Sequence, residues 1–167
     1  NGCICCTLSD DLSRQLAGIA RSGHFDYIVI EASGICEPIP IAYTISSFCD
    51  QGESGGRAPL ALDNIVAVVD AKRMFDEFDG GRDLLRDDIG EDDIESLLIQ
   101  QIEFCSTLVL NKCDLVTPVK LAELHALARS LQRDAVIVEA TKGDVPMAEL
   151  LDTGRFDFER AYGSAAW

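Results

Sequence analysis

The chain has no run of about 18 apolar residues, so no part of it predicts a membrane-spanning helix. Its first residues also lack the basic segment and following apolar stretch that mark a signal peptide. Basic residues are scarce, with 14 Lys and Arg against 29 Asp and Glu and a formal net charge of −15. Such a charge repels nucleic acid and anionic membrane surfaces. We therefore expect neither as a partner, and we expect a soluble, cytoplasmic protein.

A disulfide framework is absent as well. The seven cysteines are an odd number, and three of them cluster at Cys3, Cys5 and Cys6. The other four lie singly in or beside apolar segments. Spaced cysteines in even numbers are typical of disulfide-rich secreted domains, and this distribution is different. Reduced thiols, some of them buried, fit it best.

Four short apolar runs without alternation predict strands covered on both faces, at residues 27–30, 65–69, 107–110 and 135–138. Segments between them carry apolar residues at helical spacing. These are Leu8, Leu12, Leu16 and Ile19, then Ile94, Leu97, Leu98 and Ile102, then Leu121, Leu124, Leu127, Ala128 and Leu131. Strand and helix alternate, so we predict one α/β domain around a mainly parallel sheet.

Turn and helix-start signals complete this outline. Pro38 and the pair Thr117-Pro118 are typical of the first turns of helices. Residues 51–57, rich in glycine, and residues 76–95, with ten acidic side chains, predict exposed excursions from the sheet. We interpret the acidic stretch as solvated surface, and a metal-collecting or docking surface is the alternative.

Glu31 ends the first predicted strand, and Gly34 follows three residues later. A carboxylate at the carboxyl edge of a sheet can orient water on Mg²⁺, and a glycine amide can approach a terminal phosphate closely. Alone the motif is weak, because strands ending in glutamate are common in α/β proteins.

The sequence Asn111-Lys112-Cys113-Asp114 follows the third predicted strand directly. Asp114 can accept hydrogen bonds from N1–H and the exocyclic amine of guanine, and Asn111 can bond O6 or N7 and the loop backbone. The stem of Lys112 can cover the base. Adenine lacks this pair of donors, so the motif favours guanine over adenine. An ordinary loop without a binding role is the alternative, and the position directly after a strand favours the base-binding role. Residues 140–143, after the last strand, are a weak signal for a second loop against the base.

The thiols at Cys3, Cys5 and Cys6 have spacing that suits a soft metal ion. In an extended loop, residues i and i+2 project to one side, so Cys3 and Cys5 can converge and Cys6 needs a turn. Thr7 and Asp10 resemble a capping box and predict a helix start just after the thiols. Three thiolates favour Zn²⁺ or Cu⁺ and accept Co²⁺ or Ni²⁺. A buried or redox-active thiol patch is the alternative.

Together, five motifs resemble the CobW-like metallochaperone GTPases, relatives of the urease and hydrogenase nickel-insertion GTPases. They stand in that family's order and spacing over nearly the whole chain, at residues 1–6, 31–38, 69–71, 101–104 and 111–116. The resemblance is specific for the family and not for a member or a metal. It implies a three-layer P-loop NTPase-like core with a mainly parallel sheet, and GTP and Mg²⁺ bound near the cysteine motif.

By position, the resemblance also implies site residues. They are Cys3, Cys5 and Cys6 for the metal, Glu31 and Gly34 for the Mg²⁺ and γ-phosphate side, and Asn111, Lys112 and Asp114 for guanine. The implied activity is hydrolysis of GTP to GDP and phosphate, coupled to delivery of zinc or cobalt to a client metalloprotein or cofactor pathway. Cys36 or Glu37 is a candidate fourth ligand, although small buried filler suits Cys36 better.

Two features of the family have no counterpart in the 167 residues. Family members carry a phosphate loop, G-x-x-x-x-G-K-[ST], before the cysteine motif, and a smaller C-terminal domain after the GTPase domain; neither pattern occurs here. We therefore expect residues 1–167 to be a partial GTPase domain, incomplete at the N-terminus and inactive alone. The competing hypothesis is a non-catalytic, thiol-based metal-binding or redox α/β module.

Overall fold

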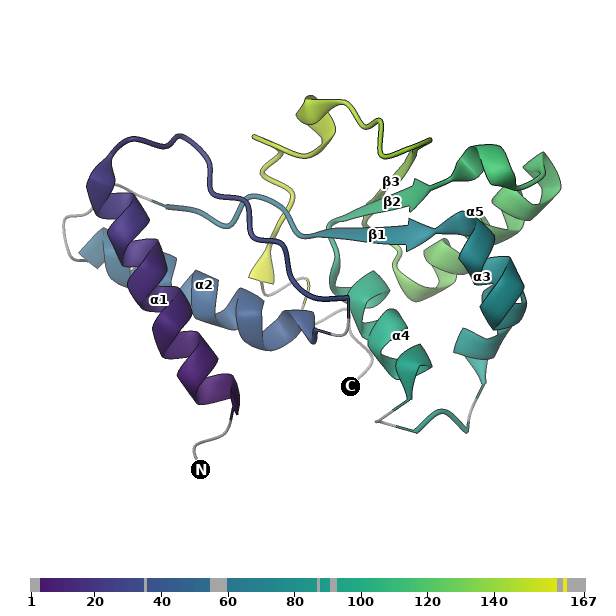
Figure 1. The fold of residues 1–167 in the computed structure, drawn as a ribbon, viewed down its shortest axis with the longest axis horizontal. Coiled ribbons are helices and arrows are strands. Elements are labelled where there is room, and N and C mark those ends of the chain that lie inside the picture. Colours follow the sequence, from purple (N-terminus) through teal and green to yellow (C-terminus); the bar gives the residue numbers. More distant parts are fainter. Residues whose placement is uncertain are drawn as a thin grey trace. The chain divides into compact units, whose positions relative to one another are not determined.

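The structure is a computed structural model that describes residues 4–34, 36–54, 60–86, 88–90, 93–158 and 161, with the backbone alone described at 4–9 and 51–54. It divides into two compact units, Asn1–Leu62 and Asp63–Trp167, which we call the N-terminal and C-terminal units. Figure 1 shows the helices of the first unit in purple and blue and the sheet of the second in teal and green.

The N-terminal unit contains two helices, α1 (Ile4–Ser22) and α2 (Pro38–Ser54). Leu16 of α1 and Phe48 of α2 are buried in a small core, against which Ile28 also packs. The helical spacing of the first segment and the helix start at Pro38 are confirmed. However, α2 continues through Ser54, so the first half of the excursion predicted at 51–57 is helical.

The strand predicted at residues 27–30 is wrong. This run forms no ladder, and Val29 is 80 % exposed. A strand needs a neighbour to take its backbone hydrogen bonds. The described part of this unit contains no strand with which residues 27–30 could pair. Apolar, β-branched composition therefore does not make this run a strand. Ile28 is the member of the run that packs against the helices.

The C-terminal unit is built on a three-stranded sheet of order β1-β2-β3, with β1 (Val66–Asp70), β2 (Thr107–Asn111) and β3 (Val136–Glu139). Both pairings are parallel, and Asp70 lies opposite Asn111. Central β2 is buried along four of its five residues, as expected for an apolar run without alternation. The α/β class and three of the four predicted strands are confirmed.

Three helices contribute to the core of this unit: α3 (Ala71–Phe78), α4 (Ile94–Phe104) and α5 (Pro118–Leu131). Buried residues of all three helices join one cluster with alternating residues of the strands, among them Val69, Leu108 and Leu110. Thr117 caps α5 by accepting a hydrogen bond from the Lys120 amide, as its sequence predicts. Three short 3₁₀ segments lie at Asp79–Leu85, Cys113–Leu115 and Met147–Glu149.

The exposed excursion predicted at 76–95 is wrong in its first half. Phe78 and Leu84 are buried in the core, although acidic neighbours surround them in sequence. Gly81 has φ 87°, and a Cβ there would lie 2.0 Å from a side-chain carbon of Leu127. The segment is therefore fitted against α5 and is not a solvated loop.

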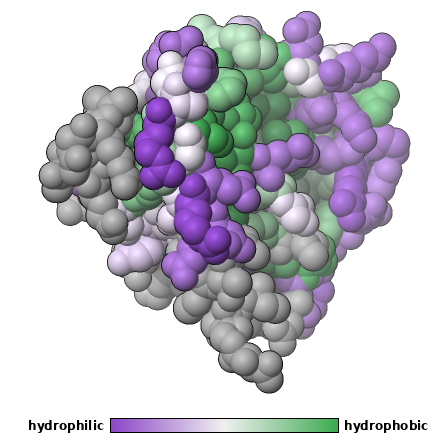
Figure 2. Space-filling view, turned by 60° about the vertical axis from the view of Figure 1, so that its left-hand side comes forward, coloured by the Kyte–Doolittle hydropathy of each residue, from purple (hydrophilic) through white to green (hydrophobic). Residues whose placement is uncertain are grey.

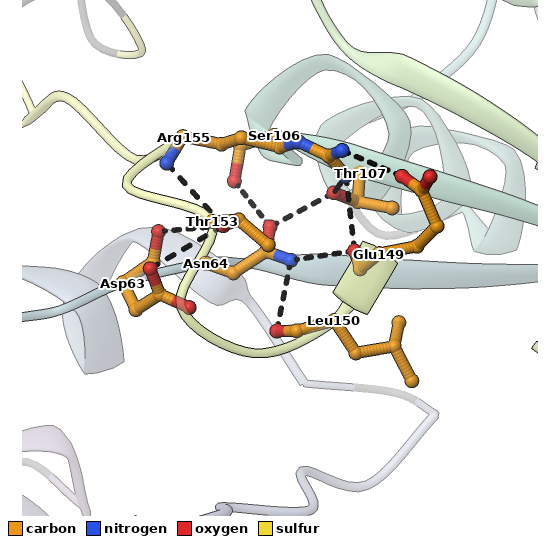
Figure 3. Close-up of polar contacts among 8 residues, drawn as sticks. All are labelled: Asp63, Asn64, Ser106, Thr107, Glu149, Leu150, Thr153 and Arg155. Atoms are coloured by element: carbon orange, nitrogen blue, oxygen red, sulfur yellow. Dashed lines mark hydrogen bonds and ion pairs between the residues drawn. The ribbon is translucent and has the colours of Figure 1, made fainter. Parts of the chain in front are cut away.

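At the amino edge of the sheet, side chains from three separate segments form a hydrogen-bonded network that we call the amino-edge clamp (Figure 3). Its members are Asp63, Asn64, Ser106, Thr107, Glu149, Leu150, Thr153 and Arg155. The Asn64 amide oxygen accepts from the hydroxyls of Ser106 (2.9 Å) and Thr107 (3.0 Å), and its nitrogen donates to the Leu150 carbonyl at 3.2 Å. One side chain thus joins the strand start to the segment after β3.

Arg155, at the far end of the same segment, makes further contacts. Its guanidinium donates to the Thr107 hydroxyl at 3.1 Å and to the Glu149 carbonyl at 2.9 Å, and it pairs with the Glu149 carboxylate at 2.5 Å. Asp63 accepts from the Gly154 amide at 2.5 Å. The clamp fastens residues 149–155 to the sheet.

No helix among the described residues is both long and apolar enough to cross a bilayer. The described surface nevertheless carries large apolar side chains, and Figure 2 shows a hydrophobic area in green on the face that it presents. Phe25, Val29, Val68, Val119 and Met147 are each more than three-fifths exposed. They come from both units and from separate segments.

Candidate functional site

The candidate site lies at the carboxyl edge of the sheet. Because the strands are parallel, their carboxyl ends share one edge, where β1 ends at Asp70, β2 at Asn111 and β3 at Glu139. Ligands of open α/β sheets bind at this edge. The predicted guanine residues Lys112 and Asp114 follow Asn111 directly, and the side chains of both are solvent-exposed.

Asn111 ties the two loops at this edge together. Its side-chain oxygen accepts a hydrogen bond from the Gly143 amide at 3.0 Å, and the Cys113 amide donates to the Ala140 carbonyl at 3.1 Å. The loop at 140–143 therefore lies beside the Asn111 loop, and its predicted place against the base stays a prediction.

Both loops have backbone in the left-handed region. Lys112 has φ 61° and Lys142 has φ 55°, followed by Gly143 at 73°. Such a conformation costs a non-glycine residue about 1 kcal/mol, and it persists only where surrounding contacts enforce it. For Lys112, one of these contacts is its carbonyl, which accepts from the Leu115 amide at 3.0 Å. Backbone strain of this kind is typical of binding loops.

Lys112 also reaches across to β1. Its ammonium lies 2.5 Å from Oδ2 of Asp70, whose Oδ1 accepts from the Arg73 amide at 3.0 Å. Burial raises the pKa of the Asp70 carboxyl, but the hydrogen bonds from Lys112 and from the Arg73 backbone outweigh it and hold the pKa below its ordinary value. Asp70 is not among the site residues predicted from the sequence. The available signal was an aspartate that ends an apolar strand and begins a helical pattern.

Glu31 and Gly34 lie in the N-terminal unit. Both are exposed, and they follow an irregular segment where a strand was predicted. The Cys36 amide donates to the Ser33 carbonyl at 2.9 Å and closes a turn around Gly34. Their approach to the guanine residues involves both units and stays a prediction.

The metal residues are described only in part. Cys3 lies outside the described residues, and Cys5 and Cys6 belong to the first turn of α1, with backbone alone described. The helix start predicted at Thr7 is therefore wrong by about a turn, because α1 begins at Ile4. Successive helical residues point about 100° apart, so the extended geometry predicted for this stretch is not the one found at Cys5. The metal role of the three thiols stays a prediction.

Other ligand candidates are sparse in the part of the chain that the structure describes, where no three His, Cys, Asp or Glu side chains gather closely enough to hold an ion. The Cys36 thiol donates to the Glu37 carbonyl at 3.3 Å. Burial and the nearby Glu37 carboxylate raise the pKa of this thiol, which opposes thiolate formation. Its role as a fourth ligand stays a prediction.

Comparison with known protein families identifies the family of this chain. Residues 1–139 match the model described as "CobW/HypB/UreG, nucleotide-binding domain". The chain belongs to the CobW/HypB/UreG family. The predicted membership is thus confirmed, and the matched domain contains both the carboxyl edge of the sheet and the cysteine cluster.

The relatives of this CobW/HypB/UreG chain support the same family membership. It is 36 % identical over 172 residues to the zinc-regulated GTPase metalloprotein activator 1 of Dictyostelium discoideum, covering 100 % of this chain and 36 % of the relative. The protein of the same name from Schizosaccharomyces pombe is 33 % identical, with 95 % and 35 % covered, and the zinc chaperone CobW of a Sinorhizobium species is 32 % identical, with 92 % and 45 % covered. The chain thus spans less than half the length of these relatives. No solved structure matches significantly.

Proposed function

We propose that the full-length protein is a GTP-hydrolysing metallochaperone that couples the nucleotide cycle to delivery of zinc to a client metalloprotein. One observation carries the guanine part of this proposal. Asn111, tied to the loop at 140–143, and Lys112, tied to β1, are held at the carboxyl edge of a parallel sheet with Asp114 exposed beside them. The matched family domain is a nucleotide-binding one.

The arrangement supports guanine over adenine on chemical grounds. The Asp114 carboxylate is an acceptor, and guanine offers it two adjacent donors, N1–H and the exocyclic amine. Adenine presents an unprotonated N1 at the same place, which would leave the carboxylate facing an acceptor. Specific sites of this kind reject the analogue that lacks the donor by large factors, because a desolvated polar group is left unpaired.

For the phosphate side, we assign Glu31 and Gly34. The exposed carboxylate of Glu31 suits Mg²⁺, which binds few protein carboxylates and keeps several waters. Mg²⁺ would neutralise charge on the phosphates, and Glu31 would orient its water shell. A Cβ built on Gly34 has no heavy atom within 4 Å, so the backbone there is open to a phosphate.

For the cargo, we assign Cys3, Cys5 and Cys6. Soft thiolates suit zinc, and two of the relatives are named as a zinc-regulated activator and a zinc chaperone. The backbone places Cys5 and Cys6 next to each other in the first turn of α1. Three thiolates would also accept Co²⁺ or Ni²⁺, and cobalt is the alternative cargo.

The test uses the full-length protein stripped of nucleotide and metal. Calorimetric titration should show binding of GDP and GTP and at least 100-fold weaker binding of ADP. Zinc titrated against a competing chelator should bind the GTP form more tightly than the GDP form, because coupling requires an affinity that depends on the nucleotide.

Two single variants separate the metal from the nucleotide. Cys5→Ser should weaken zinc binding and leave GDP affinity unchanged, and Cys49→Ser, at a thiol of α2, should change neither. Equal zinc affinity in the two nucleotide forms would rule out coupling. Equal binding of ADP and GDP would favour the competing hypothesis of a thiol module without guanine recognition.

A further inference from the structure

Asp70 occupies a fixed place beside the proposed guanine site. It ends β1 directly opposite Asn111, the end of β2, and Lys112 follows one residue later. In sequence, Asp70 and Lys112 lie 42 residues apart, yet the ammonium and the carboxylate meet at 2.5 Å. The contact is made by strand register and not by local sequence.

The two oxygens of Asp70 have separate tasks. Oδ1 accepts from the Arg73 amide at 3.0 Å and caps α3, whose first residue, Ala71, is fully buried. Oδ2 faces the Lys112 ammonium. Since the cap fixes the carboxylate on a helix anchored in the core, the second oxygen points across the strand ends from a rigid support.

Lys112 is consequently held at both of its ends. Its backbone is fixed in the left-handed region with φ 61° by hydrogen bonds of the surrounding loop, and its ammonium is fixed by Asp70. Between them, four methylene groups run from the end of β2 toward the end of β1. A free lysine side chain samples many rotamers, and ordering it on binding weakens affinity.

We propose that Asp70 is a positioning residue of the guanine site, which orders the Lys112 stem as an apolar cover for the base before nucleotide binds. This inference rests on the function proposed above and deepens its nucleotide site. Asp70 touches no nucleotide itself. Its effect on binding passes through Lys112.

The alternative is an ordinary surface ion pair. The side chain of Lys112 is 49 % exposed and that of Asp70 is 27 % exposed, and exposed pairs contribute little to stability. Under that alternative, removing the carboxylate leaves nucleotide affinity unchanged. The two accounts therefore differ in binding and not in folding.

The test is made in the full-length protein with Asp70→Ser, because serine preserves the N-cap of α3 and removes the charge. We expect GDP affinity to fall about 3- to 10-fold, the cost of ordering one long side chain on binding. Lys112→Met, which keeps an unbranched stem and loses the ammonium, should weaken GDP binding to a similar degree. The double variant should bind no more weakly than Lys112→Met alone, since the two residues act as one unit.

Two controls distinguish positioning from general damage. Asp76→Ser breaks the Lys72–Asp76 pair, which has the same 2.5 Å separation as the Lys112–Asp70 pair and lies on α3, the helix that Asp70 caps. This variant should leave GDP affinity unchanged. Pyrophosphate, which has no base to cover, should bind the wild type and Asp70→Ser equally. A structural defect at the strand ends would weaken both ligands.

Unchanged GDP affinity in Asp70→Ser, or additive losses in the double variant, would overturn the proposal. An equal loss of pyrophosphate binding would also overturn it, because the effect would not depend on the base. If the wild type shows no guanine preference, the proposed function fails first, and this outcome is visible before any variant is made.

Discussion

The two ends of the same sheet carry polar clusters of opposite character. At the amino edge, the clamp around Asn64, Thr107 and Arg155 is part-buried, and its side chains bond one another; Thr107 is fully buried. At the carboxyl edge, Asp114 and Lys112 are exposed; left-handed backbone does not separate the two edges, since Lys112 and Lys142 have it at this edge and Asp152 has it in the clamp segment. The same strands thus begin in a network whose polar groups bond one another and end in a cluster whose polar groups face solvent.

The difference separates stability from function. A polar network whose members satisfy one another in a part-buried place fixes the chain and offers nothing to a ligand. Polar groups left exposed on loops remain available for binding. Substitutions at the amino edge should therefore change the free energy of unfolding, and substitutions at the carboxyl edge should change nucleotide binding.

The largest effect is expected at the clamp. Asn64→Ala removes the acceptor for the Ser106 and Thr107 hydroxyls and the donor to the segment after β3. Leaving the buried Thr107 hydroxyl and the part-buried Ser106 hydroxyl with fewer partners should lower the free energy of unfolding by about 2–4 kcal/mol. Chemical denaturation of the full-length protein measures this, and the preference for GDP over ADP should stay unchanged.

Asn111→Ala is the matched change at the carboxyl edge. It removes the hydrogen bond from Gly143, so unfolding should become easier by only about 1 kcal/mol, while GDP binding should weaken more than 10-fold. If Asn64→Ala impairs base preference, or Asn111→Ala is the more destabilising of the two, the division between the edges is wrong.

A second contrast concerns the two thiols that flank β2. Cys105 is 3 % exposed near the amino edge, and burial raises its pKa to about 12; Cys113, at the carboxyl edge, is half-buried, and burial raises its pKa also. Since the thiolate is the nucleophile, iodoacetamide at pH 8 should alkylate Cys113 at least 10-fold faster than Cys105, as followed by mass spectrometry. GDP should slow the alkylation of Cys113 and leave that of Cys105 unchanged.

The same shift predicts a pH effect with a definite sign. The folded protein keeps the Cys105 proton to higher pH than the unfolded chain does, so the free energy of unfolding should fall as the pH rises from 9.0 toward about 12. Cys105→Ala should reduce this fall. Alkylation of native Cys105 as fast as that of Cys113 would contradict its burial.

The smallest effect is expected at the strained loop. Lys142 has φ 55°, a conformation that glycine adopts without penalty. Lys142→Gly should therefore raise the free energy of unfolding by about 0.5 kcal/mol, the gain from relieved strain less the added flexibility of the unfolded chain. Thermal unfolding with and without GDP measures it. A loss of more than 1 kcal/mol would show that the lysine side chain, and not the backbone, matters there.

Sequence patterns predicted the parts of this fold that depend on local rules. The run at 107–110 lacks alternation because β2 is buried on both faces, and Thr117-Pro118 marks the start of α5 because capping is local. The motif from Asn111 to Asp114 was found because its spacing is fixed and it follows a strand. These features need no knowledge of the rest of the chain.

The failures involve contacts between distant residues. Residues 27–30 have strand composition but form no ladder, and α3 was missed because its many charged residues hid the buried face of Met74 and Phe78. Likewise, the pairing of Asp70 with Lys112 depends on register between two strands, and the clamp joins Asn64 to residues about 85 positions later. No local pattern encodes such distances.

The most direct measurement of the central claim is the nucleotide preference of Asp114→Asn in the full-length protein. Xanthine carries a carbonyl where guanine has its exocyclic amine, so an amide donor at 114 should suit xanthine as the carboxylate suits guanine. The account predicts that the ratio of GDP to XDP affinity falls at least 100-fold, with the free energy of unfolding unchanged. An unchanged ratio would contradict a guanine site at this edge of the sheet.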